Sequence, residues 1–188
     1  MTAVLAAPSP RHAASFVAAL REGFRRGIQP VTPEQRIAEI EVDFKRYLAE
    51  ITDQSGTITL PSGEVVPKVP FSLLWLVENE AFIGEISIRH RLNTWLLQEG
   101  GHIGYGIRPA RQGRGYGRLI LELGLEVCRD LGIERALVTC KDDNLASARI
   151  IEANAGRLEN VIDDPAGGEG RTRRYWIPLG SSGESPIQ

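Results

Sequence analysis

The sequence has only 2 cysteines among its 188 residues, Cys128 and Cys140, and each lies in an apolar stretch. No cluster of cysteine and histidine has the spacing of metal ligands, so we expect two reduced core thiols and no metal site. The chain also lacks an apolar run long enough to cross a membrane. Its first residues lack the basic segment of a signal peptide. A cytoplasmic protein with no membrane partner is therefore the default expectation.

An excess of charge of one sign is also missing. Lysine and arginine number 22 and the acidic residues 24, which gives a net charge of −2 at pH 7. Nucleic-acid binding requires a concentrated cationic surface, so this balance argues against a nucleic-acid partner. The hydrophobic fraction of 42% and the charged fraction of 24% are those of an ordinary soluble globular protein.

A chain of this length suffices for one domain with a single sizeable core. We expect that domain to span residues 1–180, with a helical and hairpin elaboration at about 30–70. Residues 181–188 are expected to form a flexible tail.

Hydrophobic periodicity and turn residues divide the chain into helices and strands. Ser9-Pro10 and Thr32-Pro33 each place a capping residue before a proline, which is typical of a helix start. Helices before and after a mixed central sheet predict an α/β (α+β) fold. We expect strands at 4–6, 72–78, 81–89, 101–107, 133–140 and 173–178, helices at 9–27 (ended by Gly27), 32–51, 115–131 and 145–155, a helical turn at 92–98, a hairpin within 53–70 and a loop at 163–170.

A glycine-rich turn lies between the strand that ends near Ile107 and the helix that begins near Gly115. Backbone N–H groups at such a junction are unpaired, and the positive end of the helix dipole lies behind them. Glycine lets phosphate oxygens approach this backbone closely, and Arg111 and Arg114 add positive charge. The turn is therefore predicted to bind a phosphate or pyrophosphate.

Two common phosphate-binding loops do not fit this turn. A Walker loop ends in Gly-Lys-Ser/Thr, whereas Gly117 is followed by Arg118-Leu119. A dinucleotide fingerprint that starts at Gly113 requires glycine at position 118, which is arginine. The pattern that is present is Gln-x-x-Gly-x-Gly, from Gln112 to Gly117.

This pattern resembles the acetyl-CoA loop of the GNAT superfamily of N-acetyltransferases. The family's loop also follows a strand that ends in hydrophobic-x-Pro, here Ile107-Arg108-Pro109. One helix and one strand later, the family places an asparagine that opens a further helix, here Asn144. Without a ligand, the glycines would form a plain tight turn and Asn144 a plain helix N-cap.

The resemblance extends over residues 72–178, and over the earlier helices only by the order of elements. Four shorter segments are similar to a subgroup usually labelled only as predicted acetyltransferases. That label implies no substrate. The segments are Ile83-Gly84, Ile88-Arg89-His90, Gly101-His102-Ile103-Gly104-Tyr105 and Ile150-Ile151-Glu152-Ala153-Asn154.

The resemblance implies a largely antiparallel sheet, splayed open at the strand 101–107, with helices on both faces. Acetyl-CoA would be the co-substrate, and its pantetheine arm would bind backbone groups near Ile107 and Arg108 as an added strand does. A primary amine of a small molecule or peptide would attack the thioester directly. The cofactor contacts implied are Ile107, Arg108, Gln112, Gly113, Arg114, Gly115, Tyr116, Gly117 and Asn144.

The catalytic residues are less well defined by the resemblance. Many members carry an acidic residue early in the splayed strand, where this chain has His102, an imidazole able to accept a proton near neutrality. Glu85, in an apolar strand, is the second candidate base. Either residue could instead be structural, as a histidine bonded to a carbonyl or a paired carboxylate. The family's usual acid is a tyrosine at the place of Ile151, so the thiolate leaves unassisted or through water, or Tyr105 or Tyr175 protonates it.

Because the usual tyrosine is absent, a second class of function stays open. The chain could be a regulatory module that binds acyl-CoA without turning it over. The sequence also leaves open the amine acceptor and whether the chain forms a homodimer.

Overall fold

The computed structural model describes residues 3–26, 30–60, 63–163 and 170–180. Gly27, the expected loop at 163–170 and the expected tail lie wholly or mostly outside these residues. None of the described helices is both long and apolar enough to span a bilayer.

Seven strands form one sheet in the order β1-β4-β5-β6-β7-β9-β8. Every neighbouring pair is antiparallel except β6 and β7, which are parallel. The mixed, largely antiparallel sheet is therefore confirmed. The strands are β1 (Val4–Ala6), β4 (Phe71–Glu78), β5 (Ala81–Arg89), β6 (Ile103–Ile107), β7 (Arg135–Lys141), β8 (Arg157–Asp163) and β9 (Arg171–Pro178).

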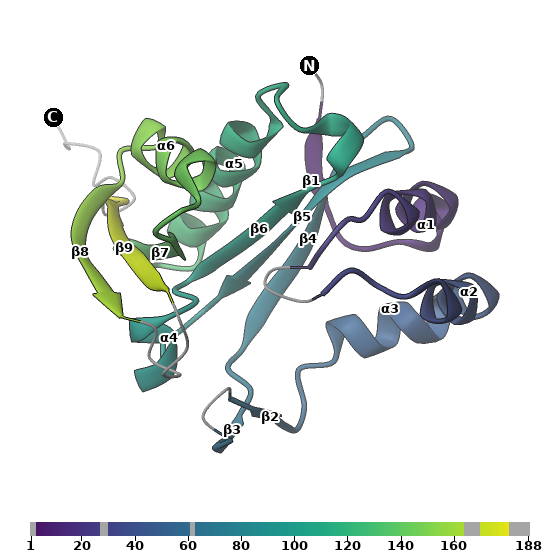
Figure 1. Ribbon diagram of the computed structural model, residues 1–188, viewed down its shortest axis with the longest axis horizontal. Helices are drawn as coiled ribbons and strands as arrows, with labels where there is room; N and C mark the ends of the chain where they lie inside the picture. Colours follow the sequence, from purple (N-terminus) through teal and green to yellow (C-terminus); the bar gives the residue numbers. More distant parts are fainter. Residues whose placement is uncertain (1–2, 27–29, 61–62, 164–169, 181–188) are drawn as a thin grey trace, which may run out of the picture.

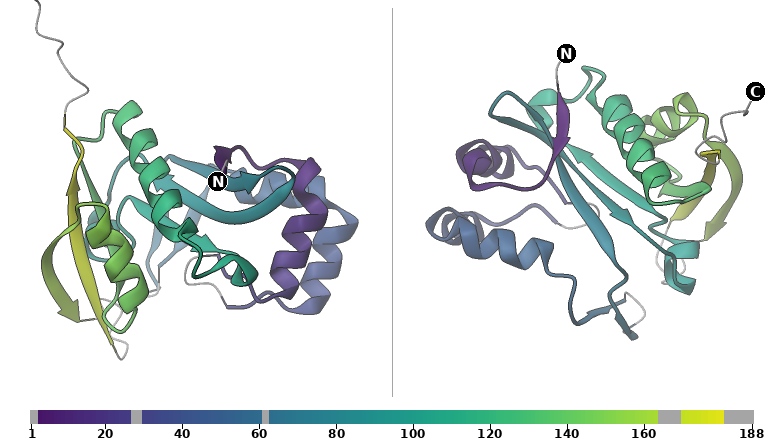
Figure 2. Two further views of the ribbon diagram at one scale, coloured as in Figure 1. Left: turned by 90° about the horizontal axis from the view of Figure 1, so that it is seen from above. Right: turned by 180° about the vertical axis from the view of Figure 1, so that it is seen from behind.

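Helices cover both faces of the sheet, as expected (Figure 1). The view from above in Figure 2 separates α1, α2 and α3 on one side from α5 and α6 on the other. A short helix, α4, and a hairpin of β2 and β3 lie near one end of the sheet. Their bounds are α1 (Ala13–Arg21), α2 (Glu34–Val42), α3 (Phe44–Thr52), α4 (Thr94–Gln98), α5 (Tyr116–Asp130), α6 (Leu145–Ala153), β2 (Thr57–Thr59) and β3 (Val65–Pro67).

The first core, on the side of α1, α2 and α3, is aromatic. Phe16 stacks on Trp75 with ring centroids 4.7 Å apart, and the edge of Phe82 meets both rings. All three side chains are fully buried. Burial of such large apolar surfaces attaches the N-terminal helices firmly to β4 and β5.

The second core lies on the opposite face and is aliphatic. Ile86 and Ile88 of β5 are fully buried in a cluster with residues of α5. Gly124 of α5 permits close packing on β5, because a Cβ there would collide with Ile86 Cδ1. Side chains alternate across a strand, so β5 supplies both cores from its two faces.

The parallel pair β6 and β7 is joined at one register position, Ile103 with Val138. Just before it, the His102 N–H donates to Leu137 O at 2.7 Å. Gly101 allows this contact, because it has φ +58 and a Cβ there would collide with that carbonyl. Beyond Ile103 no further pairing joins the strands, so the sheet is splayed where the resemblance implied.

Three element predictions were wrong. The expected helix at 32–51 is two helices, because Asp43 leaves the helical region (φ −132, ψ 70) and its carboxylate caps the Arg46 N–H at 3.0 Å. The first helix ends at Arg21, where Gly23 (φ 89) turns the chain, well before Gly27. The strand β8 was not expected, because it is an edge strand, mostly exposed and without apolar alternation.

Candidate functional site

A cavity of about 990 Å³ lies where β6 and β7 diverge. One part of its wall comes from the strands β4 to β7 with α4 and α6, and the other from α2, α3 and the β2–β3 hairpin. The splay therefore opens into a space large enough for a small substrate. Its polar lining includes Arg26, Arg36, Glu50, Asp53, Lys68, Arg89, Glu99, Tyr105, Lys141, Asn144 and Ser147.

The glycine loop has the geometry of an anion site. Gly113 (φ 71) and Gly115 (φ 85) are left-handed, and nothing lies within 4 Å of where their Cβ atoms would be. The helix α5 begins immediately afterwards. Within the described parts of the chain, the N–H groups of Gly115, Tyr116 and Gly117 donate to no other group. An anion placed here meets free donors and the positive end of the helix dipole.

Other members of the loop have structural partners. The Gln112 amide donates to Ile107 O at 3.1 Å and so ties the loop to the end of β6. The buried Tyr116 hydroxyl donates to Glu78 at 2.9 Å, so this residue can offer a ligand little beyond its N–H. A Cβ at Gly117 would lie 2.7 Å from Ile150 Cδ1. Glycine at this position thus lets α5 pack closely against Ile150 of α6.

Alternation along β6 decides which backbone groups face the gap. The pairs His102–Arg89 and Arg108–Ile83 are hydrogen-bonded across β5 and β6, so the even-numbered residues of β6 point toward β5. Tyr105 and Ile107 therefore direct their backbone groups toward β7 and the splay.

Arg108 does not fit its expected role as a backbone contact. Its N–H donates to Ile83 O at 2.9 Å, and its carbonyl accepts from the Arg111 N–H at 2.8 Å. Its guanidinium pairs with Glu22 and donates to Ser15 Oγ at 3.0 Å. Arg108 thus links β6 to α1.

Asn144 caps the helix α6, and its side-chain oxygen accepts from the Ser147 N–H at 3.1 Å. It also lines the cavity. The helix-cap interpretation is confirmed, whereas a contact with the cofactor stays a prediction.

His102 is buried and is not among the residues that line the cavity. Its ring Nδ1 accepts from the Leu137 N–H at 2.9 Å, which leaves the proton of the neutral ring on Nε2. Burial, followed by the charge of Arg89, lowers the pKa of His102 to about 4. A base needs a free lone pair and an affinity for protons near neutrality, so this geometry argues against His102 as the base.

Glu85 is also buried, and both of its oxygens are occupied. Oε1 accepts from Arg26 Nε at 2.7 Å, and Oε2 accepts from Trp75 Nε1 at 3.0 Å. Arg26, not Glu85, lines the cavity. The geometry suits a carboxylate that positions an arginine better than one that takes a proton from a substrate.

The two tyrosines considered as the acid differ sharply. Tyr175 is fully buried, and its hydroxyl donates to Glu152 at 3.1 Å. The Tyr105 hydroxyl is buried without a hydrogen-bond partner among the described residues, and Tyr105 lines the cavity with Ile151 and Ser147. Burial raises the pKa of Tyr105 to about 12, although Ser147 nearby opposes the shift. Tyr105 therefore remains protonated at the cavity wall.

A family model described as an acetyltransferase (GNAT) domain matches residues 3–156. The chain belongs to the GNAT acetyltransferase family. No curated protein matches the sequence. Membership makes the protein an N-acetyltransferase and accounts for the splayed sheet beside a glycine loop.

Solved structures of GNAT enzymes share this fold at low sequence identity. A phosphinothricin acetyltransferase from Sinorhizobium meliloti, in complex with acetyl-CoA, is 17% identical with a TM-score of 0.58, over 100% of this chain and 95% of that one. The ribosomal-protein alanine N-acetyltransferase of Escherichia coli is 11% identical with a TM-score of 0.56, over 100% of both chains. Mutant forms of a Vibrio cholerae spermidine/spermine N-acetyltransferase are 14% identical with a TM-score of 0.58, over 95% of both chains.

Sequence reasoning missed two arginines of this acetyltransferase, Arg26 and Arg89, which line the cavity. A signal for Arg89 was present. It ends an apolar strand in which Glu85, Ser87 and Arg89 recur with period 2, as expected for one face of a strand. The polar face of β5 could therefore have been assigned to the site.

His102→Asn tests whether His102 is structural, since an asparagine oxygen can accept from the Leu137 N–H in place of Nδ1. The native pKa of about 4 lies below the reference 6.5, so the unfolded chain binds more protons between these values. Wild type should therefore lose about 3 kcal/mol of stability through this group as the pH falls from 6.5 to 4. We expect the free energy of unfolding of His102→Asn, measured by chemical denaturation, to fall less steeply over this pH range.

The rate of acetyl transfer supplies the second readout for this variant. A structural histidine leaves the acidic limb of the pH–rate profile unchanged. A fall in kcat/KM of about a hundredfold, with that limb flattened, would instead establish His102 as the base.

Proposed function

We propose that this protein transfers the acetyl group of acetyl-CoA to a primary amine by direct attack of the amine on the thioester. The observation that carries the proposal is the course of β6. The strand borders the cavity at Gly104 and Tyr105 and leads, after Ile107, into the glycine loop. At about 3.3 Å per residue, the strand offers a pantetheine-like arm a path of about 10 Å between the two.

The cofactor contacts we propose follow from the free groups along this path. N–H groups of Gly113, Arg114, Gly115, Tyr116 and Gly117 would hold the pyrophosphate, with Gln112 fixing the loop. The backbone of Ile107 would pair with the pantetheine arm in the splay, in the manner of an added strand. Asn144, across the gap, would contact the same arm.

The reaction needs an acceptor for the ammonium proton, and the cavity favours solvent water in that role. Among the described residues, its carboxylates Glu50, Asp53 and Glu99 are each ion-paired with a cation. The oxyanion can be stabilised by the Tyr105 N–H, which faces the splay.

The departing thiolate needs a proton, and we propose Tyr105 as the donor. Its buried hydroxyl makes no hydrogen bond of good geometry among the described residues, although the Ser147 side chain is near enough to affect its pKa. Tyr105 also lines the same cavity as Ile151, the position of the family's usual tyrosine. A phenol supplied by β6 would thus replace the one absent from α6. The nitrogen loses two protons to water, one when the ammonium is deprotonated and one from the tetrahedral intermediate. Tyr105 gives one proton to the thiolate and regains one from water, so each turnover releases one proton to solvent.

The first experiment measures binding and turnover separately. At acetyl-CoA a hundredfold above its dissociation constant, binding to the native state alone adds about 2.7 kcal/mol to stability and raises Tm. An amine panel should then release free CoA. No rise in Tm at millimolar acetyl-CoA would refute the proposal, whereas a rise without CoA release from any amine would favour the regulatory module.

Gly115→Asn tests the loop without straining it, because asparagine tolerates left-handed backbone better than other side chains. Its side chain would project into the open volume beside the free N–H groups. We expect acetyl-CoA affinity to fall at least tenfold, about 1.4 kcal/mol, in calorimetric titration.

Gly132→Asn is the matched control, since Gly132 (φ 73) ends the same helix and also faces open space. Both variants should be similarly stable, and Gly132→Asn should bind acetyl-CoA as wild type does. Equal affinity in the two variants would place the pyrophosphate elsewhere.

Tyr105→Phe removes the proposed acid. Because the lost hydroxyl has no partner, stability should be unchanged or slightly higher. We expect kcat to fall about a hundredfold with little change in the KM for acetyl-CoA, measured as CoA release.

Tyr175→Phe provides the opposite control. It loses a bond to Glu152, so it should lose stability while keeping its turnover. Wild-type kcat in folded Tyr105→Phe would exclude Tyr105 as the acid.

A further inference from the structure

The cavity is lined by five cationic side chains, and four of them have carboxylate partners. Arg89 is the exception, with no carboxylate within 4.0 Å anywhere in the described chain. The four pairs are Arg26–Glu85 at 2.7 Å, Arg36–Glu50 at 2.5 Å, Lys68–Asp53 at 3.6 Å and Lys141–Glu99 at 2.7 Å.

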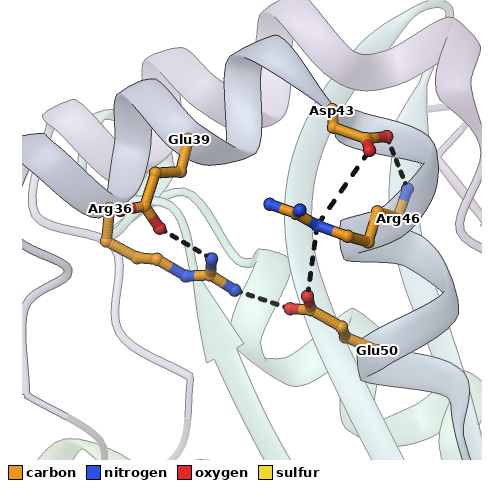
Figure 3. Close-up of polar contacts among 5 residues, drawn as sticks. All are labelled: Arg36, Glu39, Asp43, Arg46 and Glu50. Carbon is orange, nitrogen blue, oxygen red and sulfur yellow. Dashed lines mark hydrogen bonds and ion pairs between the residues drawn. The ribbon is translucent and has the colours of Figure 1, made fainter.

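Figure 3 shows the ion pairs that Arg36 of α2 and Arg46 of α3 make with neighbouring carboxylates. Arg36 donates to Glu39 at 2.9 Å and also reaches Glu50, which in turn pairs with Arg46 at 3.6 Å. The positive charges of Arg36 and Arg46 are thus already paired with carboxylates. These two side chains therefore offer little attraction to a further anion.

The surroundings of Arg89 differ. Its Nη1 donates to the carbonyls of Gly100 and Gly101 at 3.1 and 3.2 Å. Its Nη2 and Nε donate to no group among the described residues, although a guanidinium carries five N–H donors. Burial lowers the pKa of Arg89, which reflects a charge held away from water without a counter-ion. A buried cation without a counter-ion is strongly stabilised when an anion binds to its free N–H donors.

The position of the guanidinium links it to the reaction. A Cβ on Gly104 would lie 3.7 Å from Nη1 and 4.0 Å from Nη2 of Arg89. The charge therefore lies over Gly104, next in sequence to Tyr105, where the thioester is proposed to lie. An anionic group bound there would lie close to the attacking nitrogen, so the two could belong to one small acceptor.

We propose that Arg89 binds an anionic group adjacent to the reacting amine, so that the acceptor is a free α-amino acid or a close analogue. This inference rests on the proposed function, since it names the acceptor of the same site. An α-carboxylate is two bonds from its amino group, and its two oxygens match the free Nη2 and Nε donors.

Two other classes of amine fit this site poorly. A polyamine would bring further positive charge beside an unpaired guanidinium. A peptide N-terminus has its α-carboxyl in an amide bond and so offers no anion next to the nitrogen. Both classes serve as comparison acceptors in the test.

The test begins with equilibrium binding to the wild-type protein loaded with CoA, which cannot transfer an acetyl group. The ligands are the common amino acids, each beside its α-amide, with spermidine and a short peptide. The amide keeps the amine and the side chain but loses the negative charge. We expect at least one acid to bind about 10- to 100-fold more tightly than its amide, the range for hydrogen bonds to a charged group.

Arg89→Gln removes the charge but keeps a donor for the Gly100 carbonyl. It should abolish the preference for the acid over the amide, while its affinity for acetyl-CoA stays that of wild type. Arg89→Lys should restore part of the preference. Arg36→Gln is the matched control, because it removes a cation of the same cavity that carboxylates already neutralise.

The outcomes separate this inference from the proposed function. The role of Arg89 would be overturned if the amides, spermidine or the peptide bound as tightly as every acid. It would also be overturned if no acid bound at all. Either result would hold even if acetyl transfer occurs. An acid that binds through Arg89 but is never acetylated would support the anion site and refute the transferase reaction on it. A preference that survives in Arg89→Gln would also overturn the inference; the wild-type comparison alone decides if that variant does not fold.

Discussion

The interruption of pairing between β6 and β7 is the constraint on which the rest of the site depends. The two strands meet at Ile103 and Val138 and are clamped just before that point by a reciprocal pair of bonds. The His102 N–H donates to Leu137 O, and the Leu137 N–H donates to the His102 ring. Because this clamp holds one end, the strands diverge at the other without separating the sheet. Backbone donors and acceptors that would otherwise pair are thereby left for a ligand.

Stable packing on both faces of β5 keeps this opening from collapsing. Its Ile86 and Ile88 are buried against α5, and Glu85 on the opposite face is bonded to Arg26 and Trp75. The strand next to β6 is therefore held in place from both faces. An open gap beside such a strand is suited to a ligand arm that binds as an added strand. The protein backbone is already ordered there, so binding costs little further conformational entropy.

The cationic side chains of the cavity are of two kinds, those paired with a carboxylate and one that is not. Carboxylates pair with the cavity cations Arg26, Arg36, Lys68 and Lys141, whereas Arg89 meets only the carbonyls of a tight turn. The turn itself depends on Gly100 and Gly101, both with positive φ, at the start of the clamp. The geometry that splays the sheet is thus also the geometry that leaves this guanidinium incompletely paired.

The sequence by itself determined the family, the glycine loop and most elements, because these depend on local patterns: a motif, a capping residue or an apolar period. It could not show that His102 and Glu85 are enclosed by partners, since Leu137 and Arg26 are 35 and 59 residues away in the chain. It also did not reveal β8, which pairs only as an edge. Which of the two candidate tyrosines has a hydroxyl without a hydrogen bond, and which arginine of the cavity lacks a carboxylate, were decided by tertiary structure alone. Hydrogen bonds and ion pairs join residues distant in sequence, and no local pattern records them.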